Sequence, residues 1–290
     1  MSKLIHMIYL VGPNTPSYKI MHYITMKSWL VNTTANLKFY CNKIPDYSPW
    51  WHRLLSEYDN RIEIVSQEEI GQLIENYGMQ EIFSKMDSLY HKSDLLRLIA
   101  TYEFGGLYVD MDHIAIDNWD DIFDNDEPCY PCELDADHHF AAIPNGFFFT
   151  PIKNDWIKEL IEFYKDYNPE SWSETSIGKP TELYFKDPAR IRVLPAGLID
   201  PVSWRYEDWH SFFMHNIDIL EDAWAVHWSE SITKDFVKYI DLTHIMTVNT
   251  GFTKIARRYV EKYWDDIINR PRISIYERSE ERRVGKECRS

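Results

Sequence analysis

Short apolar segments alternate with longer amphipathic segments along the first part of the chain. Leu4–Val11, Leu37–Cys41 and Arg61–Val65 are rich in β-branched and aromatic residues, which is typical of buried strands. The segments from Ser17 to about Leu30 and from Ser66 to Gly78 carry apolar residues at helical spacing. Strands that alternate with helices predict an α/β fold, in which helices flank a central, mostly parallel sheet.

The second half of the chain has a less regular pattern and predicts a small antiparallel or loop-rich region. Three segments between residues 129 and 150, CYPCEL, FAAIP and GFFFT, predict short strands. A helix is expected to begin at Pro151, and a long last helix near Phe252. Residues 168–231 are expected to be mostly loops.

One domain over residues 1–277 is the simplest organisation, because no repeat or linker interrupts this range. The segment RSEERRVGKECRS at 278–290 resembles a translated sequencing adapter, so we expect it to be non-native and the natural C-terminus to be missing. The N-terminal apolar run lacks a cleavage site with small residues and is expected to be a strand, not a signal peptide.

Charge and hydropathy narrow the class of partner. The chain has 46 acidic and 31 basic residues, a formal net charge of −15. Proteins that bind nucleic acid draw affinity from clustered Lys and Arg, so a nucleic-acid partner is not expected. No apolar run approaches the length of about 18 residues that a membrane span needs, so no transmembrane helix is expected.

Residues 93–112 read SDLLRLIATYEFGGLYVDMD. This stretch predicts a helix, a glycine pair and a strand. Ser93 is the expected N-cap of the helix, and Gly105 the residue that ends it in the left-handed conformation. Tyr108, Asp110 and Asp112 alternate along the expected strand, so their side chains should project to one side.

Two carboxylates at the carboxyl end of a strand can share a hard divalent cation. Oxygen ligands suit Mg²⁺ or Mn²⁺, which usually bind one or two carboxylates together with substrate phosphates. Parallel sheets also keep their ligand crevice at this edge. The alternative is ordinary: an isolated DxD is most often a solvated loop, and Asp94 with Arg97 a surface ion pair. The fixed spacing of all these residues favours a site.

This stretch resembles the signature of DXD-containing glycosyltransferases of the GT-A fold, specifically glycosyltransferase family 32. That family includes mannosyltransferase-like and capsular polysaccharide enzymes and is related to the catalytic domains of clostridial glucosylating toxins. The opening segment IHMIYLVG and the late segment AWAVHWSES resemble two further elements of the family. The resemblance implies a GT-A-like, Rossmann-related fold and a metal-dependent, retaining hexosyltransferase.

The resemblance also implies roles for residues near the metal. Asp112 is the expected direct ligand of Mn²⁺ or Mg²⁺, and Asp110 the residue that contacts the ribose and the metal site. His227 is the expected third ligand, with a purely structural histidine as the alternative. Asp94 and Arg97 are the expected catalytic pair that binds the donor sugar and supports the leaving diphosphate.

Further implied residues concern substrate binding. Ile8 and Tyr9 lie in the opening strand, where Tyr9 stands at the position from which a Trp often stacks on the nucleobase. Tyr108 is an expected wall of the donor site, and Trp228 is expected to close over the metal and the diphosphate. Asn145 either shapes the sugar pocket or occupies a plain turn.

The expected partners are a UDP- or GDP-hexose donor and an acceptor that is a glycan or a lipid-linked sugar. The expected location is the cytoplasm, with peripheral membrane association if the acceptor is lipid-linked. The tryptophans between 204 and 228 either stack on an acceptor glycan or fill the core.

Two other functional classes are alternatives to a transferase. A HAD-like phosphohydrolase would carry the motif on its first strand and follow it with Thr, whereas His113 and Ile114 follow it here. A non-catalytic carbohydrate-binding protein could use Trp side chains but would not need the aspartate–arginine–diaspartate pattern.

Overall fold

The structure is a computed structural model, and it describes residues 3–13, 17–134, 139–171, 173–202, 205–218 and 223–268. Trp172, Trp204 and the expected non-native segment 278–290 lie outside the described residues. Within this part of the chain, no helix is long and apolar enough to cross a bilayer.

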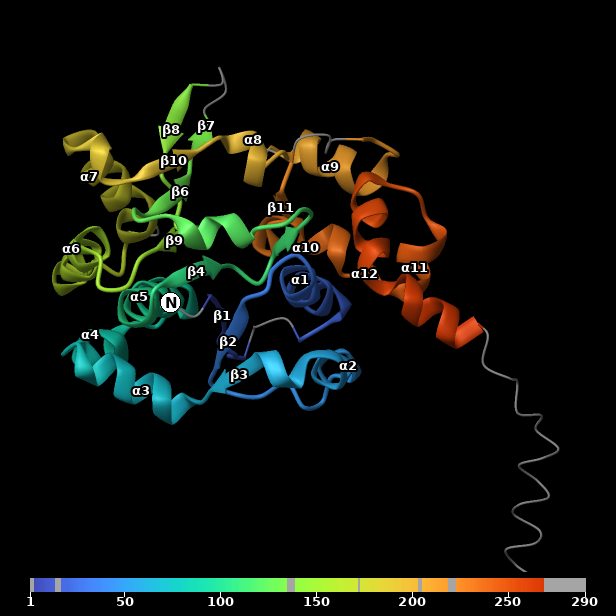
Figure 1. Cartoon of the computed structure of the whole chain (residues 1–290), viewed down its shortest axis with the longest axis horizontal. Helices are drawn as coiled ribbons and strands as arrows, with labels where there is room; N and C mark the ends of the chain where they lie inside the picture. The colour runs from blue at the N-terminus through green and yellow to red at the C-terminus, as the bar shows by residue number, and fades with distance from the viewer. Residues whose placement is uncertain are drawn as a thin grey trace, which may run out of the picture.

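A seven-stranded sheet forms the centre of the fold (Figure 1), in the order β10-β6-β9-β4-β1-β2-β3. All neighbouring strands are parallel except β9, which runs antiparallel to both β4 and β6. This sheet confirms the predicted α/β architecture. The strands are β1 (Leu4–Tyr9), β2 (Asn36–Cys41), β3 (Ile62–Val65), β4 (Gly106–Val109), β6 (Cys129–Pro131), β9 (Phe147–Thr150) and β10 (Arg192–Leu194).

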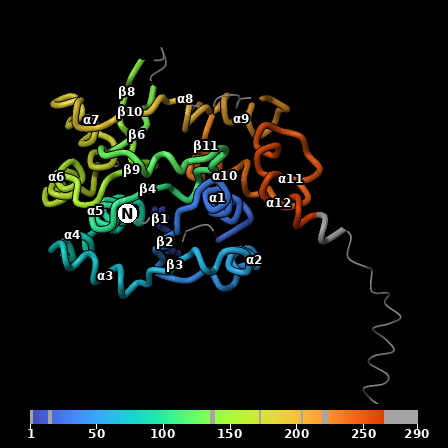
Figure 2. The backbone as a smooth tube through the Cα atoms, in the orientation of Figure 1, coloured from blue at the N-terminus to red at the C-terminus, as the bar shows by residue number. Residues whose placement is uncertain are grey.

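Helices cover both faces of the sheet, because alternate side chains of each strand enter two separate apolar cores. One core contains residues of α1 (Ile20–Val31), α2 (Pro49–Tyr58), α9 (Tyr206–Met214), α10 (Glu230–Val237), α11 (Leu242–Thr247) and α12 (Gly251–Ile268). The other contains residues of α3 (Gln67–Asn76), α5 (Leu89–Phe104), α6 (Asp155–Phe163) and α7 (Lys179–Lys186). In the tube of Figure 2, α1 and α2 lie on the same side as α9–α12, and α3 and α5 lie on the same side as α6 and α7.

Two small antiparallel sheets complete the described fold. One pairs β5 (His113–Ala115) with β11 (Ala225–His227), and its register sets His113 opposite His227. The other pairs β7 (Glu133–Leu134) with β8 (Phe140–Ala142). The expected antiparallel character of the second half is therefore confirmed.

Several predicted element boundaries were wrong. Helix α5 begins at Leu89 because Ser88, not Ser93, accepts a hydrogen bond from the first turn. Helix α6 begins at Asp155, four residues after Pro151, because the side chain of Asn154 caps it. The first helix begins at Ile20, with Lys19 and not Ser17 at the N-cap.

Other sequence signals agree with the structure. Ser66 and Glu69 form the predicted capping box at the start of α3. The long last helix is present as α12. Residues 168–231, expected to be mostly loops, also contain α7, α9 and the short helix α8 (Ala196–Ile199). These helices are too short to give a clear periodic pattern in the sequence.

Two glycines make the tight connection from α5 to β4. Gly105 has φ +64° and ψ 178°, so the helix ends in an extended glycine conformation and not in the left-handed one that was predicted. Gly106 has φ +110°, and a Cβ at this position would lie 2.5 Å from the carbonyl oxygen of Leu4 on β1. The close approach of β4 to β1 therefore depends on glycine at this position.

We predict that Gly106→Ala destabilises the fold by at least about 2 kcal/mol, because the new methyl group strains a positive φ and meets the backbone of β1. Urea denaturation followed by circular dichroism measures this change. Gly71→Ala is the matched control, since a Cβ at Gly71 in α3 meets nothing within 4 Å. The control is expected to be neutral or to stabilise by up to about 1 kcal/mol. Equal stabilities of the two variants would contradict the role given to Gly106.

Candidate active site

The two aspartates of the DxD motif lie on a turn between β4 and β5, not on one continuous strand as predicted. Strand β4 ends at Val109, and the amide of His113 donates to the carbonyl of Asp110 at 3.1 Å, which closes the turn. The amide of Asp110 donates to Gly146 O at 2.8 Å, and the amide of Trp228 donates to Asp112 O at 2.8 Å. Each aspartate is thus fixed by a different neighbouring segment.

Asp110 belongs to a buried polar cluster with Asp94, Arg97 and Asn145. The Nη2 atom of Arg97 lies 3.0 Å from Asp94 Oδ1 and 3.2 Å from Asp110 Oδ1. Its Nη1 atom donates to the backbone oxygen and the Oδ1 atom of Asn145 at 2.9 and 3.0 Å. The side-chain amide of Asn145 in turn donates to Asp94 at 3.3 Å. The structure therefore brings these four predicted residues together.

The cluster is not the solvent-exposed ion pair that was considered as an alternative. Asp94 and Arg97 are only 7% and 5% exposed. Burial opposes the charge of Arg97, but Asp110, Tyr108 and Asp94 outweigh burial and raise its pKa. Burial also raises the pKa of Asp110 to about 6, an effect that Asp112 increases and Arg97 opposes. Removing Arg97 would leave two buried carboxylates without their counterion.

Asp112 belongs to a second cluster, with His113 and His227. One ligand atom from each of these three residues lies within 4.8 Å of the other two. Asp112 Oδ1 lies 3.1 Å from His227 Nε2, and the rings of His113 and His227 stack with centroids 3.9 Å apart. The pairing of β5 with β11 produces this stack, because it sets the two histidines directly opposite each other.

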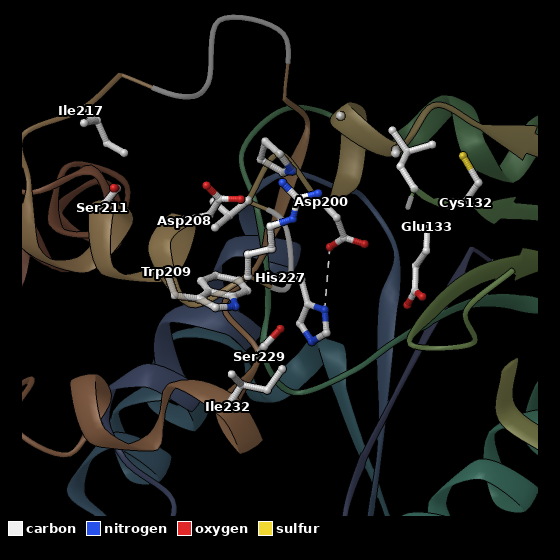
Figure 3. A pocket seen from close by; sticks show the side chains of 16 residues that line it. Cys132, Glu133, Asp200, Asp208, Trp209, Ser211, Ile217, His227, Ser229 and Ile232 are labelled. Atoms are coloured by element: carbon white, nitrogen blue, oxygen red, sulfur yellow. Dashed lines mark ion pairs between the residues drawn. The ribbon is translucent and has the colours of Figure 1, made fainter. Parts of the chain in front are cut away.

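Asp200 faces the same two histidines from the end of α8. Its Oδ1 atom is 3.8 Å from His113 Nε2 and 3.7 Å from His227 Nδ1. Figure 3 shows this carboxylate directed toward His227. Burial opposes the charge of His227, but Asp112 and Asp200 raise its pKa to about 9. Although burial acts against it, the charge of His227 holds the pKa of Asp112 well below its usual range.

The second cluster fits a divalent cation. Carboxylate oxygen and imidazole nitrogen together suit Mn²⁺ and other first-row metals. His113 Nδ1 and Asp200 Oδ1 are buried without a hydrogen-bond partner among the described residues, so both have unused capacity at this place. Asp110, expected to contact the ribose and the metal site, is held by Tyr108 and Arg97 in this structure, and its contact with a metal stays a prediction. His113, which was not predicted, belongs to the group of side chains that could hold an ion.

Three predicted substrate-binding side chains are covered by protein. Tyr108 is fully buried, donates to Asp110, and has the guanidinium of Arg97 4.5 Å from its ring centre. Trp228 is also fully buried and donates to Thr25 Oγ1 at 3.2 Å. Ile8 faces the core on the side of α5. Tyr108 and Trp228 therefore contact the motif from the protein interior, and their side chains are not accessible to a substrate in this structure.

Tyr9 is buried among aromatic rings, with Tyr18 and His22 at 5.9 and 5.7 Å. Its hydroxyl lies 3.3 Å from the hydroxyl of Tyr47, which is half exposed. A base that approaches this end of β1 would therefore meet Tyr47 before Tyr9.

The described tryptophans of the 204–228 segment differ in exposure, which confirms core packing for two of them and leaves a contact of Trp224 with an acceptor a prediction. Trp209 and Trp228 are buried in the core, whereas Trp224 is 38% exposed.

Sequence reasoning did not assign His113, Asp200 or Glu133 to the site. His113 directly follows the motif, so its position was a usable signal. Asp200 and Glu133 stand in segments without a recognisable pattern, and only the tertiary fold brings them beside His227.

Comparison with known proteins points to glycosyltransferases. Residues 26–128 match the family described as a glycosyltransferase sugar-binding region containing a DXD motif. The chain is 23% identical over 266 residues to glucan organizing enzyme 1 of Cryptococcus neoformans var. grubii. This alignment covers 86% of the chain and 66% of that protein. The chain thus spans just under two thirds of the length of this relative.

Several solved structures with a similar fold carry the name of a glycosyltransferase. The apo form of mouse xyloside xylosyltransferase 1 has a TM-score of 0.50 at 12% identity, over 80% of this chain and 99% of that chain. The apo form of glycosyltransferase GlyE from Streptococcus pneumoniae has a TM-score of 0.49 at 12% identity, over 93% of this chain and 65% of that chain. The fold is that of the GT-A glycosyltransferases, and together with the DXD match it supports an enzyme of the glycosyltransferase class. Membership of family 32 and the relation to clostridial toxins stay predictions.

The paired charges of the second cluster predict a pH-dependent stability of the metal-free protein. The pKa of His227 is about 9 in the folded state and about 6.5 when unfolded. The folded state therefore binds more protons between these values, and its stability falls as the pH rises from 6.5 through 9. We expect a loss of about 2 kcal/mol in the free energy of unfolding, measured by urea denaturation in EDTA. His227→Gln should lack this decline, and an equal decline in the variant would contradict the assignment.

Proposed function

We propose that the protein transfers a hexose from a nucleotide-diphosphate sugar to a hydroxyl group of a glycan or a lipid-linked sugar, with retention of the anomeric configuration. The observation that carries the proposal is the turn at Asp110–Asp112. It joins a buried arginine–carboxylate cluster to a carboxylate–histidine cluster that fits a divalent cation. A nucleotide-diphosphate sugar presents sugar hydroxyls to the arginine–carboxylate cluster and a diphosphate to the cation.

Asp112, His113 and His227 would hold the cation, which we propose to be Mn²⁺ or Mg²⁺. Such an ion, when bound, supplies positive charge that stabilises the negative charge of a departing diphosphate. The amide of Glu230 donates to Asp112 Oδ2 at 2.8 Å, and this bond keeps the carboxylate oriented while Oδ1 faces His227. The protein therefore fixes the ligand set before the substrate binds.

Arg97 and Asp94 are the proposed catalytic residues on the donor side. The guanidinium of Arg97 is oriented by Asn145, Asp94 and Asp110, so its positive charge needs little reorganisation during the reaction. We propose that Asp94 binds a hydroxyl of the donor sugar, and that Asn145 aligns Asp94 and Arg97. Asp110, the member of this cluster that stands on the same turn as Asp112, would contact the ribose.

The nucleobase of a UDP- or GDP-sugar is proposed to bind at the end of β1. Tyr9 would act through its hydroxyl contact with Tyr47, whose half-exposed ring offers the stacking surface. Ile8 precedes Tyr9 at this end of β1 and is proposed to form part of the same binding site. The proposed location is the cytoplasm, with peripheral membrane association if the acceptor is lipid-linked.

Neither of the two alternative classes is favoured. The DxD motif follows the fourth strand of the sheet in chain order and not the first, which a HAD-like phosphohydrolase would use. Two tryptophans that a carbohydrate-binding protein could have exposed are buried in the core. The match to DXD glycosyltransferases covers the motif itself.

We predict that Asp112→Asn abolishes metal-dependent nucleotide binding, because it removes the charge of the one carboxylate in the ligand cluster. In the wild type, UDP or GDP should raise the melting temperature only when Mn²⁺ is present. The variant should lose this increment and at least about a hundredfold of Mn²⁺-dependent sugar-nucleotide hydrolysis.

Asp121→Asn is the matched control, since Asp121 is an exposed aspartate of the segment that follows β5. It should behave as the wild type. Circular dichroism confirms that both variants are folded. Full Mn²⁺-dependent activity in the folded Asp112→Asn protein would rule out the proposed metal site, and nucleotide stabilisation that does not need metal would argue against the transferase as a whole.

A further inference from the structure

The segment 228–230 binds both the backbone and the side chain of Asp112. The amide of Trp228 donates to Asp112 O at 2.8 Å, and the amide of Glu230 donates to Asp112 Oδ2 at 2.8 Å. Between them, Ser229 has φ +48° and ψ 70°, a left-handed conformation that residues other than glycine rarely adopt. The two bonds to Asp112 therefore require a backbone conformation that this segment does not favour by itself.

Part of this segment faces open space. Ser229 and His227 line a cavity of about 480 Å³, together with Asp200 and Glu133. The cavity side therefore gives the left-handed Ser229 little support, and the contacts that hold the segment in place come from elsewhere in the chain.

Two residues of α1, three positions apart, contact the segment. The indole Nε1 of Trp228 donates to Thr25 Oγ1 at 3.2 Å. The Nε2 atom of His22 lies 3.3 Å from Glu230 Oε2. Residues three apart share one face of a helix, so the same face of α1 holds both ends of the segment.

The start of α1 fixes the tautomer of His22. The amide of Lys19 donates to His22 Nδ1 at 3.0 Å, so this nitrogen accepts a hydrogen bond and carries no proton. The proton of the imidazole is therefore on Nε2, the atom that faces Glu230. Because the side chain of His22 is only 2% exposed, bulk water does not compete for this proton.

Packing alone does not explain an imidazole at position 22. The ring stacks on Tyr18 with centroids 5.3 Å apart, and it meets Tyr9 and Trp228 edge-on at 5.7 and 6.2 Å. A phenylalanine would fill the same aromatic surroundings. It could not donate a hydrogen bond to Glu230, which is therefore the specific contribution of the imidazole.

We propose that His22 is a positioning residue of the cation site, which acts through Glu230 on the carboxylate of Asp112. His22 holds the side chain of Glu230, which keeps the Glu230 amide on Asp112 Oδ2. The other oxygen of Asp112 is then directed toward His227. The inference rests on the proposed function, and it makes His22, which is not one of the proposed ligands, a determinant of cation affinity.

Binding of Mn²⁺ alone to the full chain, followed by electron paramagnetic resonance of the free ion, tests this proposal. His22→Phe should weaken Mn²⁺ binding at least about tenfold, as is typical when a partner of a metal ligand is removed. His22→Gln should retain most of the affinity, because its amide nitrogen can still donate to Glu230. Glu230→Ala keeps the amide that binds Asp112 but removes the carboxylate, and it should lose at least as much affinity as His22→Phe.

A double-mutant cycle separates this role from a general effect on packing. If His22 acts through Glu230, the double variant should bind Mn²⁺ about as well as Glu230→Ala alone, because the second substitution removes nothing further. A histidine that only stabilises the core would give additive losses.

Amide hydrogen exchange in the metal-free protein gives a readout that does not need the cation. The amides of Trp228 and Glu230 should exchange severalfold faster in His22→Phe than in the wild type, because the segment opens more readily. In His22→Gln they should exchange at close to the wild-type rate. Circular dichroism confirms that all variants are folded.

Lys27→Met is the matched control, since Lys27 also lies on α1 and forms an ion pair at 2.9 Å, but with Glu57 of α2. It should match the wild type in Mn²⁺ affinity and in the exchange of both amides. Wild-type Mn²⁺ affinity in folded His22→Phe protein, additive losses in the cycle, or unchanged amide exchange would each overturn the inference and leave the proposed function intact. No Mn²⁺ binding by the wild type would contradict the preformed ligand set and the inference together, whereas nucleotide-dependent thermal stabilisation tests the transferase separately.

Discussion

Charge compensation around a single turn is the constraint on which the site depends. The chain places Asp110 and Asp112, with one residue between them, on a turn where both side chains are partly buried, so their like charges repel. Arg97 neutralises the first and His227 the second, so the two carboxylates are held by opposite halves of the chain. Without both partners, the turn could not keep two ionised groups away from bulk water.

The fold supplies the two charge partners from separate elements. Helix α5 brings Arg97 to the turn from the N-terminal half, while β11 brings His227 from the C-terminal half. Buried aromatic side chains, Tyr108 and Trp228, hold the two segments from behind. The glycine pair at 105–106 lets α5 run directly into β4, so that the helix and the turn have a fixed relation.

Local signals in the sequence predicted much of the first half of the fold. The capping box at Ser66 and the β-branched strands depend on a few neighbouring residues, and Asp94, Arg97 and Asp110 stand within one helix–turn–strand unit, so these signals could be recognised directly. Boundaries failed where two residues competed for one role, as Ser88 and Ser93 did at the start of α5. The DxD strand was predicted too long because alternation continues through Met111 and Asp112, although the chain already turns there.

The residues that were not predicted depend on contacts between distant segments. Nothing in the sequence around Asp200 or Glu133 distinguishes them from other acidic residues, and only the tertiary fold places them at the cavity.

Pairing of β5 with β11 also has a consequence for biosynthesis. The matched region 26–128 contains Asp112 and His113 but not His227, so a fragment ending there lacks the third residue of the proposed ligand set. During synthesis, the proposed ligand set is therefore completed late, only after β11 has paired with β5.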